Sequence, residues 1–141
     1  MTRVFFYHGA GDRLAAAASL ISKAFAQRKR VLVYTPDADV AAALDRQLWV
    51  YPPESFVPHV RADSSLASET PIVIAERLDS IPQDERLFNL SDEVPPGFAR
   101  FANLIELVGA HEQQRAAGRR RARTYLDRGY EVSYFDLSGK A

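Results

Sequence analysis

The 141 residues contain no cysteine and carry a formal net charge of zero. Without cysteine the chain can form no disulfide and offers no thiolate as nucleophile or metal ligand, which favours a cytoplasmic protein. A neutral chain has no overall field that would draw it to nucleic acid or to an anionic membrane, so any basic function must be local. The apolar run at the N-terminus is too short for a signal peptide or a membrane span.

Motifs for nucleotide binding and hydrolysis are also missing. The turn 8–11 (His-Gly-Ala-Gly) follows an apolar run, but it lacks the third glycine of a dinucleotide fingerprint and the Gly-Lys-Ser/Thr of a Walker loop. His8, His59 and His111 stand in no metal-ligand spacing, and no hydrolase motif is present. We therefore expect no catalytic residue, metal or cofactor. A nucleotide-dependent enzyme or sensor that uses the turn 8–11 stays open as an alternative.

Apolar runs that alternate with amphipathic segments determine the expected fold. Strands are predicted over residues 4–7, 31–34, 71–75, 86–90, 104–108 and 130–137, and helices after Asp12, after Asp37 and over 112–128. This order indicates right-handed strand-helix-strand units. We expect one α/β domain over residues 1–141, with a Rossmann-like, mostly parallel sheet flanked by helices and no nucleotide site.

The most distinctive stretch is 48–59, which holds three prolines, three aromatic residues and the only tryptophan. Its prolines exclude a helix interior or a central strand, and they predict a rigid turn that leads to a short edge strand. Such a loop can present Trp49 and Phe56 at little entropic cost, and tryptophan is frequent at interface hot spots. The alternative is that Trp49 ends the preceding helix and packs in the core.

The predicted last helix is rich in arginine. At 100° per residue, Arg115, Arg119 and Arg123 line up along the border of an apolar face, whereas three further arginines point elsewhere. The face consists of Gly118, Ala122, Tyr125 and Leu126, and the other arginines are Arg120, Arg121 and Arg128. Guanidinium groups match carboxylates in bidentate fashion, so this border predicts a local anion site. The alternatives are a solvated basic face and direct binding of single-stranded DNA, although no known DNA- or RNA-binding module surrounds the helix.

Together these stretches resemble the chi subunit family of bacterial DNA polymerase III holoenzyme. The resemblance spans essentially the whole chain, and its most specific parts are Leu48-Trp49, the segment 53–59 and the strand 30–33. It implies a non-catalytic replisome adaptor, an accessory subunit of DNA polymerase III. That adaptor links the clamp loader, through the psi subunit, to the C-terminal tail of single-stranded DNA-binding protein, contacts DNA only indirectly and has no membrane partner.

The resemblance also implies which residues serve each face. Trp49 and Phe56 are assigned to psi, on a surface that the family can also offer to a helicase. The tail face is assigned Val108, Arg115, Arg119 and Arg123.

The tail ends in acidic residues and a C-terminal phenylalanine. We expect Arg119 to bind the terminal carboxylate and Val108 to receive the ring, while the neighbouring arginines attract the acids. Where some members of the family carry an aromatic residue on the basic helix, this chain has Ala122. The pocket is therefore expected to be shallower, or to use Tyr125 in place of that ring.

Overall fold

The computed structural model describes residues 1–50, 57–79 and 83–138. In these ranges, seven parallel strands form one sheet in the order β3-β4-β2-β5-β6-β1-β7. The strands are β1 (Arg3–Ala10), β2 (Val31–Tyr34), β3 (His59–Arg61), β4 (Ile72–Ala75), β5 (Arg86–Asn89), β6 (Asn103–Gly109) and β7 (Glu131–Asp136). The helices are α1 (Arg13–Ala26), α2 (Ala38–Val50), α3 (Glu112–Asp127) and the short 3-10 helix η1 (Phe98–Arg100). The predicted parallel α/β sheet is confirmed.

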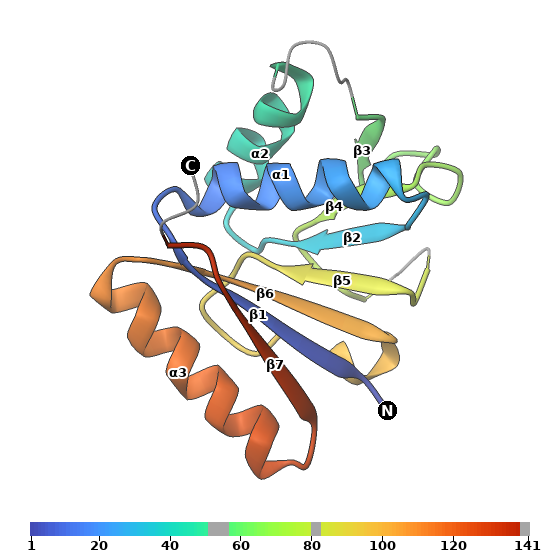
Figure 1. Cartoon of the computed structure of the whole chain (residues 1–141). Coiled ribbons are helices and arrows are strands. Elements are labelled where there is room, and N and C mark those ends of the chain that lie inside the picture. The colour runs from blue at the N-terminus through green and yellow to red at the C-terminus, as the bar shows by residue number, and fades with distance from the viewer. Residues whose placement is uncertain (51–56, 80–82, 139–141) are drawn as a thin grey trace.

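The sheet separates two apolar layers. Helices α1 and α2 cover one face and α3 covers the other (Figure 1). The predicted strand 31–34 is β2, which is buried on both sides over Val31–Val33, whereas Tyr34 is half-buried. Asp12 begins α1 by accepting a hydrogen bond from the amide of Ala15 at 3.1 Å. The predicted short edge strand is β3.

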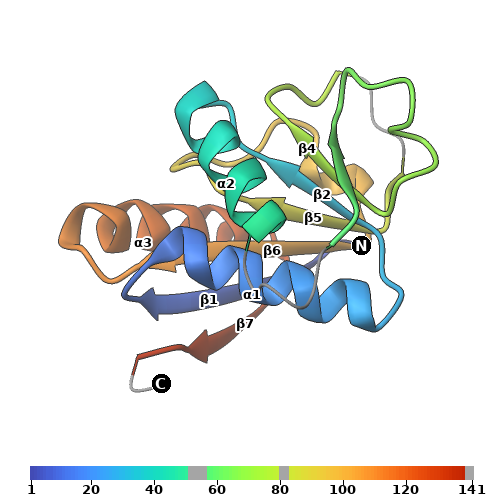
Figure 2. The ribbon, with the colours of Figure 1, turned by 90° about the horizontal axis from the view of Figure 1, so that it is seen from above.

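Strand β7 forms the edge of the sheet next to β1 (Figure 2). The chain leaves β1 through α1 on one face and leaves β6 through α3 on the other, so α3 packs across β6, β1 and β7. This arrangement sets the basic helix beside an open sheet edge. Within the described ranges, no helix combines the length and apolar character that crossing a membrane requires.

Candidate binding groove between α3 and β7

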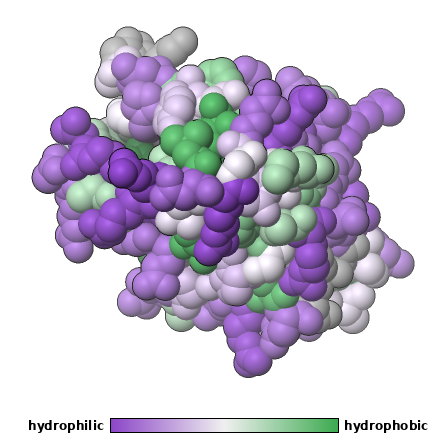
Figure 3. All heavy atoms as spheres, turned by 90° about the horizontal axis from the view of Figure 1, so that it is seen from below, coloured by the Kyte–Doolittle hydropathy of each residue, from purple (hydrophilic) through white to green (hydrophobic). Residues whose placement is uncertain are grey.

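A groove of about 1240 Å³ runs between α3 and the β1–β7 edge of the sheet. Phe6, Val108, Gly118, Ala122 and Tyr134 contribute its apolar floor. The Tyr134 ring is 53% exposed and stacks on Phe6 with ring centroids 5.8 Å apart. Viewed from the side of α3, the molecule shows hydrophobic surface enclosed by hydrophilic side chains (Figure 3). The groove therefore offers an aromatic-sized apolar surface with a polar border.

Gly118 allows α3 to approach the sheet closely at the groove floor. A Cβ atom at this position would lie 3.0 Å from both methyl groups of Val108. Val108 is buried beneath the helix and still lines the groove. The predicted apolar position at Val108 thus forms part of the floor, and any larger residue at 118 would have to push the helix away.

Arg115, Arg119 and Arg123 line the groove together with Val108, so the structure brings all four predicted tail-face residues to one place. In the free protein Arg119 donates to Glu112 Oε1 at 2.8 Å, and Arg115 Nη1 lies 3.7 Å from Glu112 Oε2. These pairs are exposed and contribute little to stability. The guanidinium groups can therefore exchange Glu112 for a ligand carboxylate at small cost.

One prediction about α3 is confirmed and another is wrong. Arg121 points away from the groove, as predicted, and it points into the protein: its side chain is 3% exposed and its Nε donates to Glu106 Oε1 at 3.0 Å. Leu126 does not pack in the apolar face, because it is half exposed at the groove border. The buried side of the helix is instead formed by Ala117, Gly118, Arg121 and Tyr125. The burial of Arg121 could have been predicted from Glu106. A charged residue in an otherwise apolar strand needs a buried partner of opposite charge.

Tyr125 is also unavailable to the groove. It is completely buried, and its hydroxyl donates to Glu106 Oε2 at 2.5 Å. Burial, followed by the charge of Glu106, raises the pKa of Tyr125 above its usual range. Ala122 does line the groove, and the exposed ring on the floor is Tyr134 of β7. Sequence reasoning missed Tyr134, because only the sheet order places β7 opposite α3.

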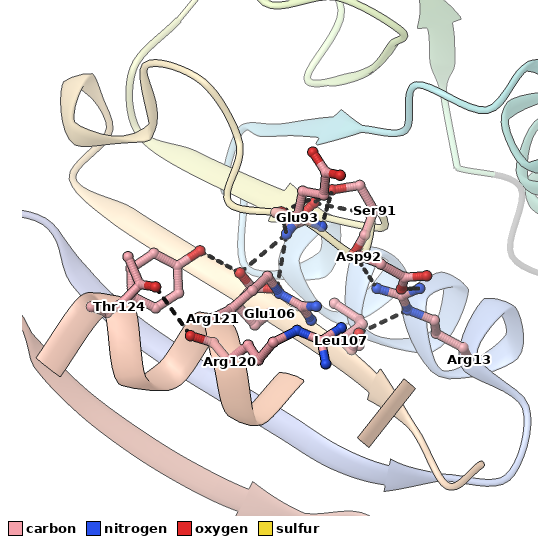
Figure 4. Close-up of polar contacts among 11 residues, drawn as sticks. Arg13, Ser91, Asp92, Glu93, Glu106, Leu107, Arg120, Arg121 and Thr124 are labelled. Carbon is pink, nitrogen blue, oxygen red and sulfur yellow. Dashed lines mark hydrogen bonds and ion pairs between the residues drawn. The ribbon is translucent and has the colours of Figure 1, made fainter. Parts of the chain in front are cut away.

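A buried polar network holds α3 against the sheet (Figure 4). Glu106 accepts hydrogen bonds from Asn89 Nδ2 at 3.0 and 3.1 Å, besides those from Arg121 and Tyr125. Burial raises the pKa of Glu106, while the charge of Arg121 and the hydrogen bonds from Tyr125 and Asn89 oppose that shift. Because the carboxylate binds two α3 side chains at once, it fixes the rotation of the helix and the exposure of the groove arginines.

The same network extends to the start of α1. Arg13 donates to the carbonyl oxygens of Leu107 at 2.8 Å and Ser91 at 2.7 Å, and it pairs with Asp92 at 3.1 Å. Burial lowers the pKa of the Arg13 guanidinium, and Asp92 opposes the shift. These contacts tie together α1, the loop after β5, and β6.

The predicted turn 8–11 is wrong for residues 8–10, which belong to the end of β1, and this strand end is unsuited to phosphate. Gly9 has φ of 75°, and a Cβ there would lie 2.9 Å from Asp136 Oδ1. Hydrogen bonds from the Ser138 hydroxyl and amide lower the pKa of Asp136, so a carboxylate faces this strand end. An anion bound there would be repelled, which counts against the nucleotide alternative. In the described part of the chain, no group of three or more His, Cys, Asp or Glu residues could hold a metal ion.

Trp49 lies in the last turn of α2, so the prediction that a loop carries it is wrong and the alternative that it ends the preceding helix is confirmed. Its predicted packing in the core is wrong, because 60% of the residue is exposed. Its ring packs edge-on against His59 with centroids 5.6 Å apart. His59 in turn contacts Asp45 at 2.8 Å and the Val57 carbonyl oxygen at 2.7 Å. Phe56 lies outside the described residues. Because α2 and α3 cover opposite faces of the sheet, Trp49 and the groove belong to separate surfaces (Figure 1).

Comparisons with known proteins agree on one family. The family described as "DNA polymerase III chi subunit, HolC" matches residues 1–133. The DNA polymerase III subunit chi of Pseudomonas aeruginosa is 33% identical over 138 residues, which cover 94% of each chain. The Escherichia coli protein of the same name is 28% identical over 127 residues, covering 86% of each.

Among solved structures, the C-terminal domain of yeast Dbp5 L327V, determined with Gle1 H337R and IP6, has a TM-score of 0.65. The match covers 98% of this chain and 91% of that one. At 8% identity this likeness concerns the fold alone.

Proposed function

Because the chain belongs to the DNA polymerase III chi subunit family and is thus an accessory subunit in DNA replication, we propose that it acts as a single-domain, non-catalytic adaptor. One surface binds the C-terminal tail of single-stranded DNA-binding protein. A second surface binds the psi subunit of the clamp loader. The protein works in the cytoplasm and reaches DNA only through these partners.

The observation that carries the tail-binding proposal is the apolar floor beneath three exposed arginines. A C-terminal phenylalanine needs an apolar surface for its ring, which Val108, Ala122 and Tyr134 supply. Its terminal carboxylate needs a forked donor, which we assign to Arg119. Each charge-assisted hydrogen bond contributes about 1.5–3 kcal/mol. Arg115 and Arg123 attract the acidic residues of the tail and mainly raise the association rate at low salt.

The psi surface is proposed around Trp49. A large ring that is 60% exposed and held against His59 presents apolar area without further ordering, as an interface anchor requires. We propose that Phe56 extends this surface and that a helicase can use it in place of psi. The two partners can bind together because Trp49 and the groove lie on opposite faces of the sheet.

The test is a calorimetric titration with a synthetic peptide of the tail, with and without its terminal phenylalanine, at low and high salt. Saturable binding that requires the phenylalanine and weakens with salt is expected. Arg119→Ala should weaken binding by about tenfold or more. Arg77→Ala is the matched control, because Arg77 is also an exposed arginine paired with a carboxylate, Asp79, at 2.8 Å.

The same titration with a single-stranded oligonucleotide separates the adaptor from a protein that binds DNA directly. The neutral chain should give no saturable binding to the oligonucleotide at physiological salt. If the peptide fails to bind while the oligonucleotide binds through Arg119, the adaptor proposal is wrong.

A further inference from the structure

Strand β7 is an open sheet edge with exposed aromatic residues on both of its faces. Among the strands of the described residues it pairs with β1 alone, at the end of the sheet (Figure 2). Tyr134 is 53% exposed and Phe135 is 42% exposed. Proteins usually protect such an edge, because its free amide and carbonyl groups invite another strand. An edge that no other described strand covers, directly beside a binding groove, suggests that the ligand itself pairs with it.

The backbone groups that face outward can be assigned from the pairing. The amide of Leu137 donates to the His8 carbonyl oxygen at 2.8 Å, so this residue faces β1. Successive residues of a strand alternate, and therefore Val132, Tyr134 and Asp136 direct their amides to the open edge. Tyr134 and Asp136 also line the α3 groove with their side chains.

The two sides of this edge differ in chemistry. On the α3 side, Arg115, Arg119 and Arg123 border the groove next to β7. On the α1 side, Phe135 stacks on Tyr7 and Phe5, with centroids 4.9 and 6.3 Å apart. A strand placed along β7 would have every second side chain beneath the arginines and the others beside Phe135. That pattern fits an extended acidic peptide.

We propose that the acidic tail binds as an added strand on β7, so that its backbone is recognised as well as its terminus. This inference rests on the proposed function, and it specifies how the protein binds the peptide residues that precede the terminal phenylalanine. The peptide pairs with the outward amides of Val132, Tyr134 and Asp136. Its acidic side chains face α3, where they replace Glu112 as partners of the arginines.

A second copy of the chain fits this edge less well. If two β7 strands paired antiparallel about their centres, Glu131 of one copy would lie opposite Asp136 of the other. Like charges directly opposite each other destabilise a strand pair. The acidic ends of β7 therefore disfavour self-pairing. An acidic strand from another protein avoids the same repulsion only if its carboxylates lie over the middle of β7, where the arginines of α3 border the groove.

The test is a scan of the tail peptide with a single backbone N-methyl group at successive positions, titrated into the full chain. Each methyl group removes one amide donor and leaves the side chains unchanged. We expect alternation: methylation at every second residue should weaken binding roughly fivefold or more, and methylation between them should have little effect. Amide hydrogen exchange should slow at Val132, Tyr134 and Asp136 when the unmodified peptide binds.

A variant of the protein provides an independent test of the strand pairing. Val132→Pro removes one outward amide, at an edge position where proline is tolerated. It should weaken peptide binding roughly fivefold, whereas Val132→Ala retains the amide and should bind nearly as the wild type does.

If the unmodified peptide binds but N-methylation is tolerated at every position, the strand pairing is wrong and tail binding stands. If the unmodified peptide does not bind at all, both proposals fall. A doubled mass in light scattering, with the same amides protected before any peptide is added, would assign the edge to a second copy and overturn the inference.

Discussion

Glu112 competes with the ligand for the groove arginines, so its removal should strengthen tail binding. One of its carboxylate oxygens accepts from Arg119 at 2.8 Å, and the other lies 3.7 Å from Arg115. A tail carboxylate must displace Glu112 before it can bind either guanidinium group. Glu112→Gln retains the size of the side chain and removes its charge.

The expected magnitude follows from the exposure of these pairs. Exposed ion pairs contribute about 0.2–1 kcal/mol each, so freeing two arginines should raise the affinity for the tail peptide roughly two- to thirtyfold. Glu112 also lies in the first turn of α3, where a negative charge stabilises the helix by interacting with the positive end of its dipole. The substitution should therefore lower the free energy of unfolding by roughly 0.5–1.5 kcal/mol.

Calorimetric titration and thermal unfolding measure the two effects. The matched control is Glu76→Gln, which removes the same charge and breaks an ion pair with Arg61 of 2.7 Å beyond β4, away from α3. Tail affinity should rise for Glu112→Gln and stay unchanged for Glu76→Gln, and the difference should shrink at high salt. An unchanged or lower affinity for Glu112→Gln would refute the idea that the arginines bind tail carboxylates.

Three further substitutions test the buried network, the groove floor and the second surface. Arg121→Met should lower the free energy of unfolding by about 3–5 kcal/mol in urea titrations, because it leaves Glu106 buried without a cation. Its cost should grow as pH rises above the ordinary pKa of glutamate, about 4.3, because removal of Arg121 takes away the charge that opposes the raised pKa of Glu106. A folded-state pKa raised further above the unfolded value gives stability that is lost on deprotonation. Gly118→Val should weaken tail binding by displacing α3 from Val108, seen as a higher Kd in a fold that still melts cooperatively. Trp49→Ala should abolish psi binding in pull-down assays and leave the tail affinity unchanged; loss of cooperative melting in this exposed variant would contradict the assignment.

The sequence predicted the layers of the fold because its strands are continuous apolar runs, such as Val31–Tyr34, separated by amphipathic helices. Local spacing also placed Arg115, Arg119 and Arg123 on one border of α3, where the structure confirms them beside the groove. Both results depend only on short-range periodicity.

Long-range pairing could not be predicted in the same way. The burial of Arg121 depends on Glu106, which lies 15 residues earlier on a strand that α3 crosses. Helical periodicity put Arg121 on the side away from the groove, and that was correct, but it did not indicate that this side faces the sheet. Tyr134 was missed for a related reason, because its place on the groove floor follows from the position of β7 at the sheet edge.

The most direct test of the adaptor account is an amide chemical-shift map of the ¹⁵N-labelled chain titrated with the tail peptide. The account predicts that the largest shifts fall at Val108, Gly118, Arg119, Ala122 and Tyr134, which meet only at the groove. Residues around Trp49 and His59 should stay unchanged. Shifts that gather around Trp49 instead, with the groove amides unmoved, would contradict the central claim that α3 and β7 form the tail-binding surface.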